Sequence, residues 1–207
     1  MLAVDGESIV GYGTYEAIAL IRGPAGTEVT LVIERPGGEE PFEVTVTRAS
    51  IQIPLVEAEM LEGDVAYVSL RDFSTTADTQ LEEAVSNLLA QEPVGLVFDL
   101  RGNPGGWLDQ AVKVSDMFLE EGVVLIERSS DGREDIFRSE DGDIGEEIPL
   151  VVLVNEGSAS ASEIVAGAIQ ARERGVLVGT TTFGKGSVQP PYRLSDGSEL
   201  RVTIARW

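Results

Sequence analysis

Ser160 and Lys185 are the two residues of this chain best suited to covalent chemistry, because the sequence contains no histidine and no cysteine. A serine hydroxyl attacks a carbonyl only when a neighbouring base takes its proton, and the usual base is imidazole. A lysine amine can take that place where apolar surroundings lower the lysine pKa and leave the amine neutral. The apolar, glycine-rich segment 183–186 could supply such surroundings. The pair therefore favours a hydrolase with a serine nucleophile and a lysine base.

Each member of the pair also has a purely structural interpretation. Segment 160–163, Ser-Ala-Ser-Glu, satisfies a helix capping box, in which Ser160 accepts a hydrogen bond from the amide of Glu163. The same position suits catalysis, because unpaired amides at a helix amino terminus can hold a developing oxyanion. Lys185, taken alone, is a surface lysine in a glycine turn. Both interpretations stay open at this point.

Gln189 follows the lysine and could hold it in place through its side-chain amide. In a regular strand the side chains of residues 185 and 189 share a face but lie about 13 Å apart, at about 3.3 Å per residue. A bend at Gly184 or Gly186 is therefore required to bring them together.

Segment 102–106, Gly-Asn-Pro-Gly-Gly, taken alone is better explained as a tight strand-to-helix turn than as a source of oxyanion donors. Glycine lets a backbone amide face a ligand without obstruction, so Gly105 or Gly106 could supply a second donor. We expect the neighbouring Asp99 and Arg101 to form a structural ion pair, and we assign them no chemistry.

The composition excludes several classes of function. There are 36 acidic and 15 basic residues, and the net charge of −21 would repel nucleic acid backbones and anionic lipid surfaces. The absence of cysteine and histidine removes disulfides and the commonest zinc ligands. We expect no cofactor, no metal and no nucleic acid partner. The sequence also shows no long apolar run of the kind that spans a membrane.

Strands and helices alternate in the second part of the chain, which predicts an α/β fold with a largely parallel sheet. We expect apolar strands at 65–70, 94–98, 123–127 and 150–154, the second of them buried on both faces. Helices are expected after Thr75-Thr76, over 108–119 and after Ser160. In parallel sheets ligands bind at the carboxyl ends of strands, so the loops that follow residues 99 and 154 should share one cleft.

The first part of the chain, residues 1–50, is predicted to be a small β-rich unit. A short strand at 2–4, a helix at 15–21 and a hairpin of strands at 27–35 and 42–48 are expected. Residues 49–63 are interpreted as a connection. So few elements give a thin core for an independent domain.

Three segments in order, 99–106, 153–163 and 179–189, resemble the sequence blocks of the carboxyl-terminal processing peptidases, the tail-specific proteases of peptidase family S41. The resemblance implies a catalytic serine at Ser160 and a catalytic lysine at Lys185. It also implies that Gln189 supports the lysine, and that the amides of Gly106 and Ala161 form the oxyanion hole. It assigns no residue to substrate binding.

The same resemblance implies a domain organisation. Residues 51–207 would form a ClpP/crotonase-like serine peptidase core, truncated at its carboxyl end, and residues 1–50 the later part of a PDZ domain. The carboxylate-binding loop and the peptide-pairing strand of such a domain have no counterpart. We therefore expect an internal fragment, and we predict that its open strand edge makes it less stable or makes it oligomerise.

The activity implied is that of a serine endopeptidase that forms an acyl-enzyme and cleaves unfolded or tagged proteins selected by an apolar free carboxyl terminus. Members of the family act outside the cytoplasm, in the periplasm, cell envelope or thylakoid lumen. One alternative is a catalytically inactive PDZ-containing scaffold on the same fold, which would not need Ser160, Lys185 and Gln189 intact. Another is a crotonase-like acyl-CoA enzyme, which retained acyl-CoA binding would favour.

Overall fold

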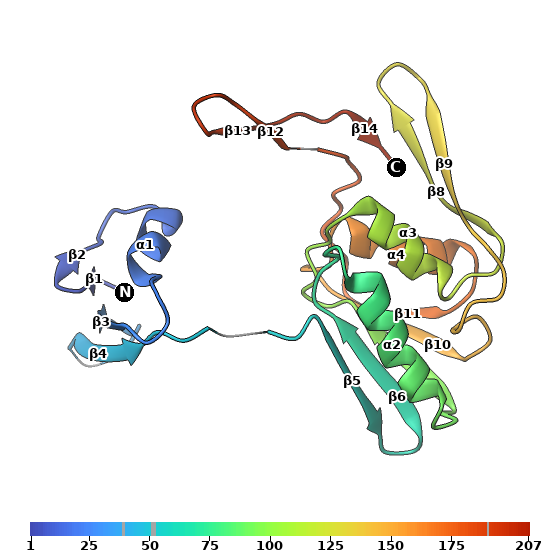
Figure 1. Ribbon diagram of the computed structural model, residues 1–207, viewed down its shortest axis with the longest axis horizontal. Helices are drawn as coiled ribbons and strands as arrows, with labels where there is room; N and C mark the ends of the chain where they lie inside the picture. Colours follow the sequence, from blue (N-terminus) through green and yellow to red (C-terminus); the bar gives the residue numbers. More distant parts are fainter. Residues whose placement is uncertain (39, 51–52, 190) are drawn as a thin grey trace. The chain divides into compact units, whose positions relative to one another are not determined.

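The computed structural model describes residues 1–207 except 39, 51, 52 and 190. The chain divides into two compact units, Met1–Ile53 and Pro54–Trp207. Figure 1 shows the helices and strands of both units along the sequence. No helix among the described residues is both long enough and apolar enough to cross a membrane.

The first unit is a four-stranded antiparallel sheet with one short helix. The sheet order is β2-β1-β3-β4, with β1 at Ala3–Val4, β2 at Glu7–Ser8, β3 at Glu28–Ile33 and β4 at Phe42–Thr47. Helix α1, Thr14–Ile21, has no buried residue of its own. The core consists of Val4, Ile9, Val29 and Leu31. The predicted hairpin and helix are present, and the core is as thin as the sequence suggested.

The second unit is built on a five-stranded mixed sheet in the order β11-β10-β7-β6-β5, which confirms the α/β prediction. Only the pair β5 and β6 is antiparallel. The strands are β5 (Val56–Leu61), β6 (Val65–Leu70), β7 (Gly95–Asp99), β10 (Leu150–Val154) and β11 (Val176–Gly179). The helices are α2 (Ala77–Leu89), α3 (Leu108–Asp116) and α4 (Ala161–Ala171).

One part of the predicted organisation is wrong. Segment 49–63 is not only a connection, because Val56–Leu61 forms β5 and pairs with β6 along its whole length. Its apolar residues alternate with Glu57 and Glu59, as suits an edge strand with one solvated face. Gly63 and Asp64, both with positive φ, make the tight turn into β6. Residues 51 and 52 of that prediction lie outside the described residues.

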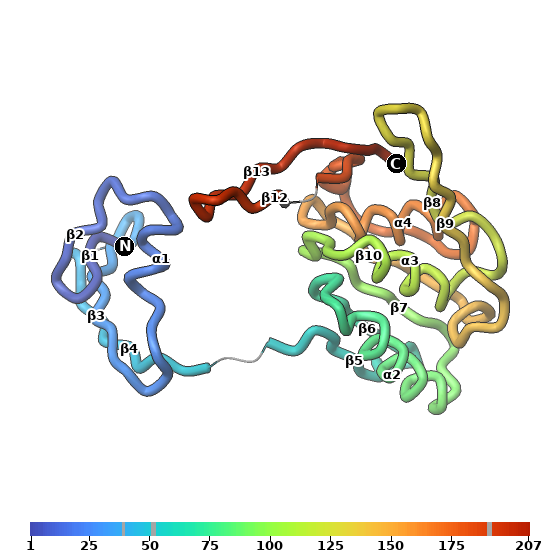
Figure 2. Tube along the Cα trace, turned by 45° about the horizontal axis from the view of Figure 1, so that its top comes forward, coloured from blue at the N-terminus to red at the C-terminus, as the bar shows by residue number. Residues whose placement is uncertain are grey.

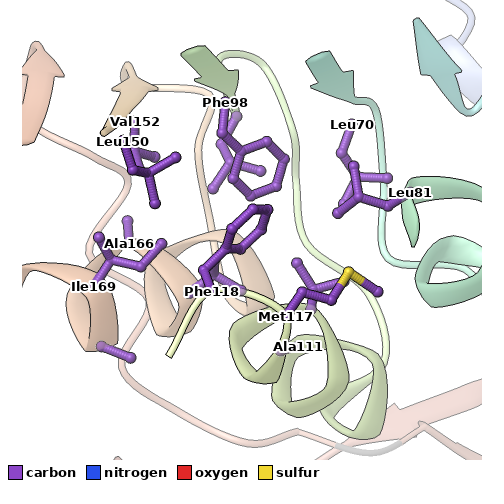
Figure 3. Packing of buried hydrophobic residues seen from close by; sticks show 14 of the residues in the cluster. Leu70, Leu81, Phe98, Ala111, Met117, Phe118, Leu150, Val152, Ala166 and Ile169 are labelled. Carbon is purple, nitrogen blue, oxygen red and sulfur yellow. The ribbon is translucent and has the colours of Figure 1, made fainter. Parts of the chain in front are cut away.

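The core of the second unit lies between one face of the sheet and the helices. Figure 3 shows side chains of the strands directed toward the helices, with Phe98 and Phe118 in contact at the centre. The two ring centroids are 5.3 Å apart, a favourable separation for an aromatic pair. Leu96 and Phe98 are fully buried on this face, whereas Val97 on the other face is only half-buried. The expectation that this strand is buried on both faces is therefore wrong for this chain.

The remaining strands form two smaller sheets. One has the order β14-β8-β9, with β8 at Gly122–Ser129, β9 at Glu134–Ser139 and β14 at Ala205–Arg206. The other is the hairpin of β12 (Pro191–Arg193) and β13 (Glu199–Arg201). Figure 2 shows the chain returning from this hairpin to β8, where it ends. On the way Val188 pairs with Ala205, which brings the C-terminal segment beside the residues that follow Lys185.

Candidate active site

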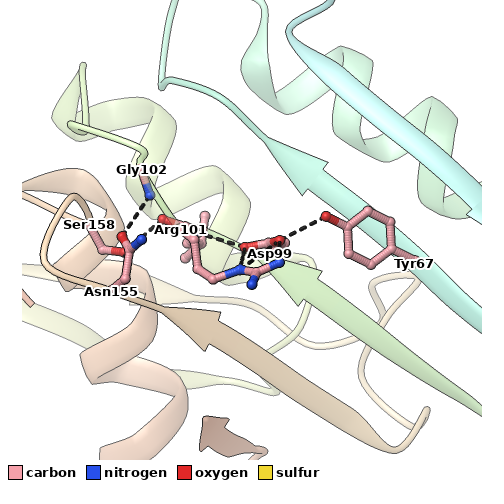
Figure 4. Close-up of polar contacts among 7 residues, drawn as sticks. Tyr67, Asp99, Arg101, Gly102, Asn155 and Ser158 are labelled. Carbon is pink, nitrogen blue, oxygen red and sulfur yellow. Dashed lines mark hydrogen bonds and ion pairs between the residues drawn. The ribbon is translucent and has the colours of Figure 1, made fainter. Parts of the chain in front are cut away.

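Two loops meet at the carboxyl ends of the neighbouring strands β7 and β10. Asn155 links them, because its Oδ1 accepts a hydrogen bond from the amide of Gly102 in the other loop at 2.8 Å, and it also accepts the amide of Gly157 in its own loop at 3.0 Å. The buried Ser158 hydroxyl donates to the carbonyl of Leu100 at 2.7 Å. Figure 4 shows this junction. The two loops predicted to share a cleft are thus bonded directly to one another.

Ser160 lies at the amino terminus of α4 in a strained backbone conformation. Its φ of 57° and ψ of −114° are rare for a residue other than glycine, and such a residue stores about 1–3 kcal/mol of strain. The amide of Ser160 donates to Glu163 Oε2 at 2.9 Å, and the amide of Glu163 donates to the main-chain carbonyl of Ser160 at 2.9 Å. The helix end is therefore capped by backbone and carboxylate, which leaves the hydroxyl available for chemistry.

The glycine turn approaches Ser160 so closely that no side chain would fit there. A Cβ on Gly105 would lie 2.6 Å from the carbonyl of Ala159 and 2.7 Å from Cβ of Ser160. A Cβ on Gly106 would lie 2.3 Å from the carbonyl of Phe73. The φ values are +95° and +157°. Gly105 is therefore needed for close packing against the serine loop and Gly106 for close packing against Phe73, and both are needed for the turn itself.

Glu163 joins the serine loop to the lysine loop. Besides the Ser160 amide, its carboxylate accepts the amides of Gly184 at 2.6 Å and Lys185 at 3.0 Å, and the hydroxyl of Thr182 at 2.8 Å. Partial burial raises the pKa of Glu163, but these hydrogen bonds together outweigh it and hold the pKa below its ordinary value. An ionised Glu163 thus fixes the backbone on both sides of the site.

The bend that the lysine loop requires is present. Gly184 and Gly186 have φ values of 79° and 46°, and the segment around Lys185 belongs to no strand. Open space surrounds both Cβ positions, so these glycines serve the backbone conformation alone. The bend lets the chain turn back, and Lys185 and Gln189 line the same pocket.

All five residues proposed from the sequence line that pocket, which has a volume of about 250 Å³. Its wall also contains Trp107, which the sequence allowed as a core or cleft-wall residue, and further apolar or small residues to which the sequence assigned no place in a site: Leu108, Ile164, Ser187, Val188 and Trp207. A cavity of about 550 Å³ lies between β8 and segment 203–207, but it contains none of the five. The smaller pocket is therefore the candidate site.

The pocket brings Ser160 and Lys185 together without joining them. Among the described residues, the Lys185 side chain makes no hydrogen bond or ion pair, so it is not committed elsewhere. Gln189 Nε2 donates to Thr203 Oγ1 at 2.8 Å, a partner that only the folded C-terminal segment supplies. Within the same described ranges, the amides of Gly106 and Ala161 have no protein acceptor. Both amides are available to a ligand in the pocket.

Asp99 and Arg101 form the ion pair expected from the sequence, at 2.6 Å. Asp99 also accepts a hydrogen bond from the hydroxyl of Tyr67 at 2.7 Å (Figure 4). Burial raises the pKa of Asp99, but the Arg101 guanidinium, aided by Tyr67, holds it below its usual range. Neither Asp99 nor Arg101 lines the pocket, which agrees with a structural role.

A strained serine at a helix amino terminus thus lies around one pocket with a lysine and with free glycine and alanine amides, which are the groups that nucleophilic catalysis by a serine requires. Residues 64–207 match the family model described as peptidase family S41. The chain belongs to this family.

Known proteins with similar sequences and structures carry related names. A carboxy-terminal-processing protease of Bartonella bacilliformis is 42% identical over 98% of this chain and 48% of its own length. A carboxyl-terminal-processing protease of Synechocystis is 39% identical over 100% of this chain and 49% of its own length. The solved structure of a photosystem II D1 C-terminal processing protease matches with a TM-score of 0.71 and 34% identity, over 99% of this chain and 57% of that one. The chain thus spans about half the length of the curated relatives.

Proposed function

We propose that this chain carries the active site of a carboxyl-terminal processing serine endopeptidase, with Ser160 as nucleophile and Lys185 as base. The observation that carries the proposal is that Ser160, Lys185, Gln189 and the amides of Gly106 and Ala161 line one pocket. Membership of peptidase family S41 and the names of the relatives support it.

The reaction begins when the neutral amine of Lys185 takes the proton of the Ser160 hydroxyl, and Oγ attacks the carbonyl carbon of the scissile peptide bond. The carbonyl oxygen becomes an oxyanion and accepts hydrogen bonds from the amides of Gly106 and Ala161. The tetrahedral intermediate collapses, the carbon–nitrogen bond breaks, and the leaving amine takes the proton back from Lys185. Water, deprotonated by the same amine, then hydrolyses the acyl-enzyme.

Gln189 keeps the base in position in this scheme. Its Nε2 donates to Thr203, which leaves Oε1 to accept a hydrogen bond from the lysine amine. The hydrogen bond to Thr203 fixes the orientation of the Gln189 side-chain amide. Because Thr203 belongs to the C-terminal segment, that segment contributes to the site.

The substrate proposed is an unfolded or tagged protein with an apolar free carboxyl terminus. The apolar pocket wall, formed by Trp107, Leu108 and Ile164, suits an apolar side chain beside the scissile bond. Residues 1–50, within the first unit, are proposed to be the later part of a PDZ domain, which in its complete form would hold the carboxyl terminus. The proposed location is outside the cytoplasm, as in the family that the sequence resembles.

The test is cleavage of an unfolded protein that ends in apolar residues, followed by intact mass. Ser160→Ala and Lys185→Ala should abolish cutting. Ser115→Ala, a buried serine of α3, and Lys113→Ala, an exposed lysine paired with Asp78, should keep it. Cutting that survives in Ser160→Ala would overturn the proposal. If the parent chain binds the protein but none of the chains cuts it, the inactive scaffold is the better description.

A further inference from the structure

Asn103, in the middle of the glycine turn, is a fully buried polar residue whose side chain hydrogen-bonds to backbone groups of two segments. Its side chain has 0% exposure. Nδ2 donates to the carbonyl of Leu70, at the end of β6, at 2.8 Å. Oδ1 accepts from the amide of Gly105 at 2.9 Å. The side chain therefore ties the flexible glycine pair to a rigid strand of the central sheet.

The main chain of Asn103 makes a second connection, to the serine loop. Its carbonyl accepts hydrogen bonds from the amide of Ala159 at 3.0 Å and from the hydroxyl of Ser162 at 2.9 Å. Ser162 is itself fully buried in the first turn of α4. One residue thus links β6, the glycine turn and the helix terminus that bears Ser160.

The glycine turn needs such a support, because its own sequence does not fix its conformation. Gly105 and Gly106 have positive φ, and glycine has a wide choice of backbone conformations. Apart from Asn103, the turn is held at Gly102 by Asn155 and at its other end by Phe73, whose amide donates to Gly105 and whose carbonyl accepts from Trp107, each at 2.9 Å. Phe73 thus bonds to Gly105 and Trp107, and Asn103 bonds to Gly105. The amide of Gly106 lies between these supports.

From this network we infer that Asn103 is a positioning residue that sets the Gly106 amide opposite the Ala161 amide, so that both point at one oxygen atom. The inference rests on the proposed function, in which these amides bind the oxyanion. Asn103 does not line the pocket and touches no reacting atom. Its effect on the reaction passes through the direction of a neighbouring amide, and a small misplacement of a donor is costly to the rate.

The experiment compares Asn103→Ala and Ser162→Ala with Ser115→Ala in the full chain. Ser115 is a matched control, because it is a fully buried serine that donates to a backbone carbonyl, Ala111, at 2.8 Å but lies away from the turn. Two quantities are measured. The first is hydrogen exchange of segment 102–107, which requires no activity. The second is the ratio of kcat for a small activated ester to kcat for its thionoester, because a sulfur atom fits an oxyanion hole poorly.

In Asn103→Ala we expect faster exchange of segment 102–107, a kcat for the ester that falls about tenfold to a hundredfold, and an unchanged KM. The ester to thionoester ratio should fall as well, whereas partial unfolding would lower both rates equally. Ser162→Ala should show the same changes to a smaller extent, and Ser115→Ala should show none of them.

Two results would overturn the inference. One is exchange of the turn in Asn103→Ala that is as slow as in the parent chain. The other is faster exchange with an unchanged ester to thionoester ratio. The proposed function is judged separately, by whether Ser160→Ala abolishes ester hydrolysis. If the ester is hydrolysed equally well without the serine, the proposed function fails, while the exchange data still decide whether Asn103 holds the turn.

Discussion

Replacing Glu163 by glutamine should separate the lysine loop from the serine loop. One carboxylate oxygen accepts the Thr182 hydroxyl and the Gly184 amide, and the other accepts the amides of Ser160 and Lys185. Glutamine has a single acceptor oxygen, so one of these two pairs of donors must lose its partner. Each hydrogen bond to a charged acceptor is worth about 1.5–3 kcal/mol. Because the residue is only partly buried and water can replace a lost partner, we expect a net loss of about 2–4 kcal/mol.

The separation of the two loops is measured by denaturant unfolding, by hydrogen exchange of segment 180–187 and by the cleavage assay. In the Glu163→Gln variant the amides of this segment should exchange faster. The variant should also lose most of its cleavage activity, because Lys185 is no longer held beside Ser160. Glu156→Gln is the matched control: Glu156 contacts the same loop through a single exposed hydrogen bond from Thr180, at 3.2 Å. If Glu163→Gln keeps the slow exchange and the activity of Glu156→Gln, the connecting role of Glu163 is refuted.

Three other predictions follow from the site. Gly105→Ala should destabilise the chain by about 3–5 kcal/mol, because the added Cβ overpacks the site and the residue has a positive φ. Gly102→Ala should cost only about 1–2 kcal/mol, because Gly102 has a positive φ but a Cβ there would meet open space. Equal shifts of the melting temperature in the two variants would contradict this. Since the folded pKa of Glu163 is lowered, its stabilisation is complete above the unfolded pKa of about 4.3 and is lost as pH falls through the lower folded value. Acid exchange profiles should show this loss in the parent chain and not in Glu163→Gln. Thr203→Val removes the hydrogen-bond acceptor for Gln189. The variant should have an unchanged KM and a kcat about fivefold lower, which is the equivalent of a neutral hydrogen bond of about 1 kcal/mol. Unchanged kinetics would exclude a role of Thr203 in holding Gln189.

The central sheet and its helices could be predicted because their signals are local. Strand Leu150–Val154 is a continuous apolar run, and Leu81, Val85 and Leu88 repeat with the helical period, so both elements are found where the sequence places them. Segment 56–61 was not predicted as a strand because its alternation of apolar and acidic residues covers only six positions, and its place in the sheet depends on pairing with β6. The burial of the second face of β7 depends on which residues pack against it, and the periodicity of apolar residues in the strand does not indicate those residues.

The candidate site likewise has parts that could be predicted from the sequence and parts that could not. Ser160, Lys185 and the glycine turn were proposed from sequence motifs, and the structure places Ser160, Lys185 and Gly106 around one pocket. The apolar pocket wall was not proposed, since Trp207 reaches it only after the C-terminal segment returns to pair with Val188. The turn sequence gave only a weak indication of a role for Asn103. Its role depends on the carbonyl of Leu70, a contact between distant segments that no local pattern indicates.

The central claim is that Lys185 activates Ser160, and the most direct measurement is the rate at which a fluorophosphonate probe modifies Ser160, followed by intact mass from neutral to alkaline pH. If Lys185 is the base, the rate in the parent chain rises with pH through one basic ionisation, the rate in Lys185→Ala is slow and lacks that rise, and Ser160→Ala forms no adduct. The same rate and the same pH profile in the parent chain and in Lys185→Ala would contradict the central claim.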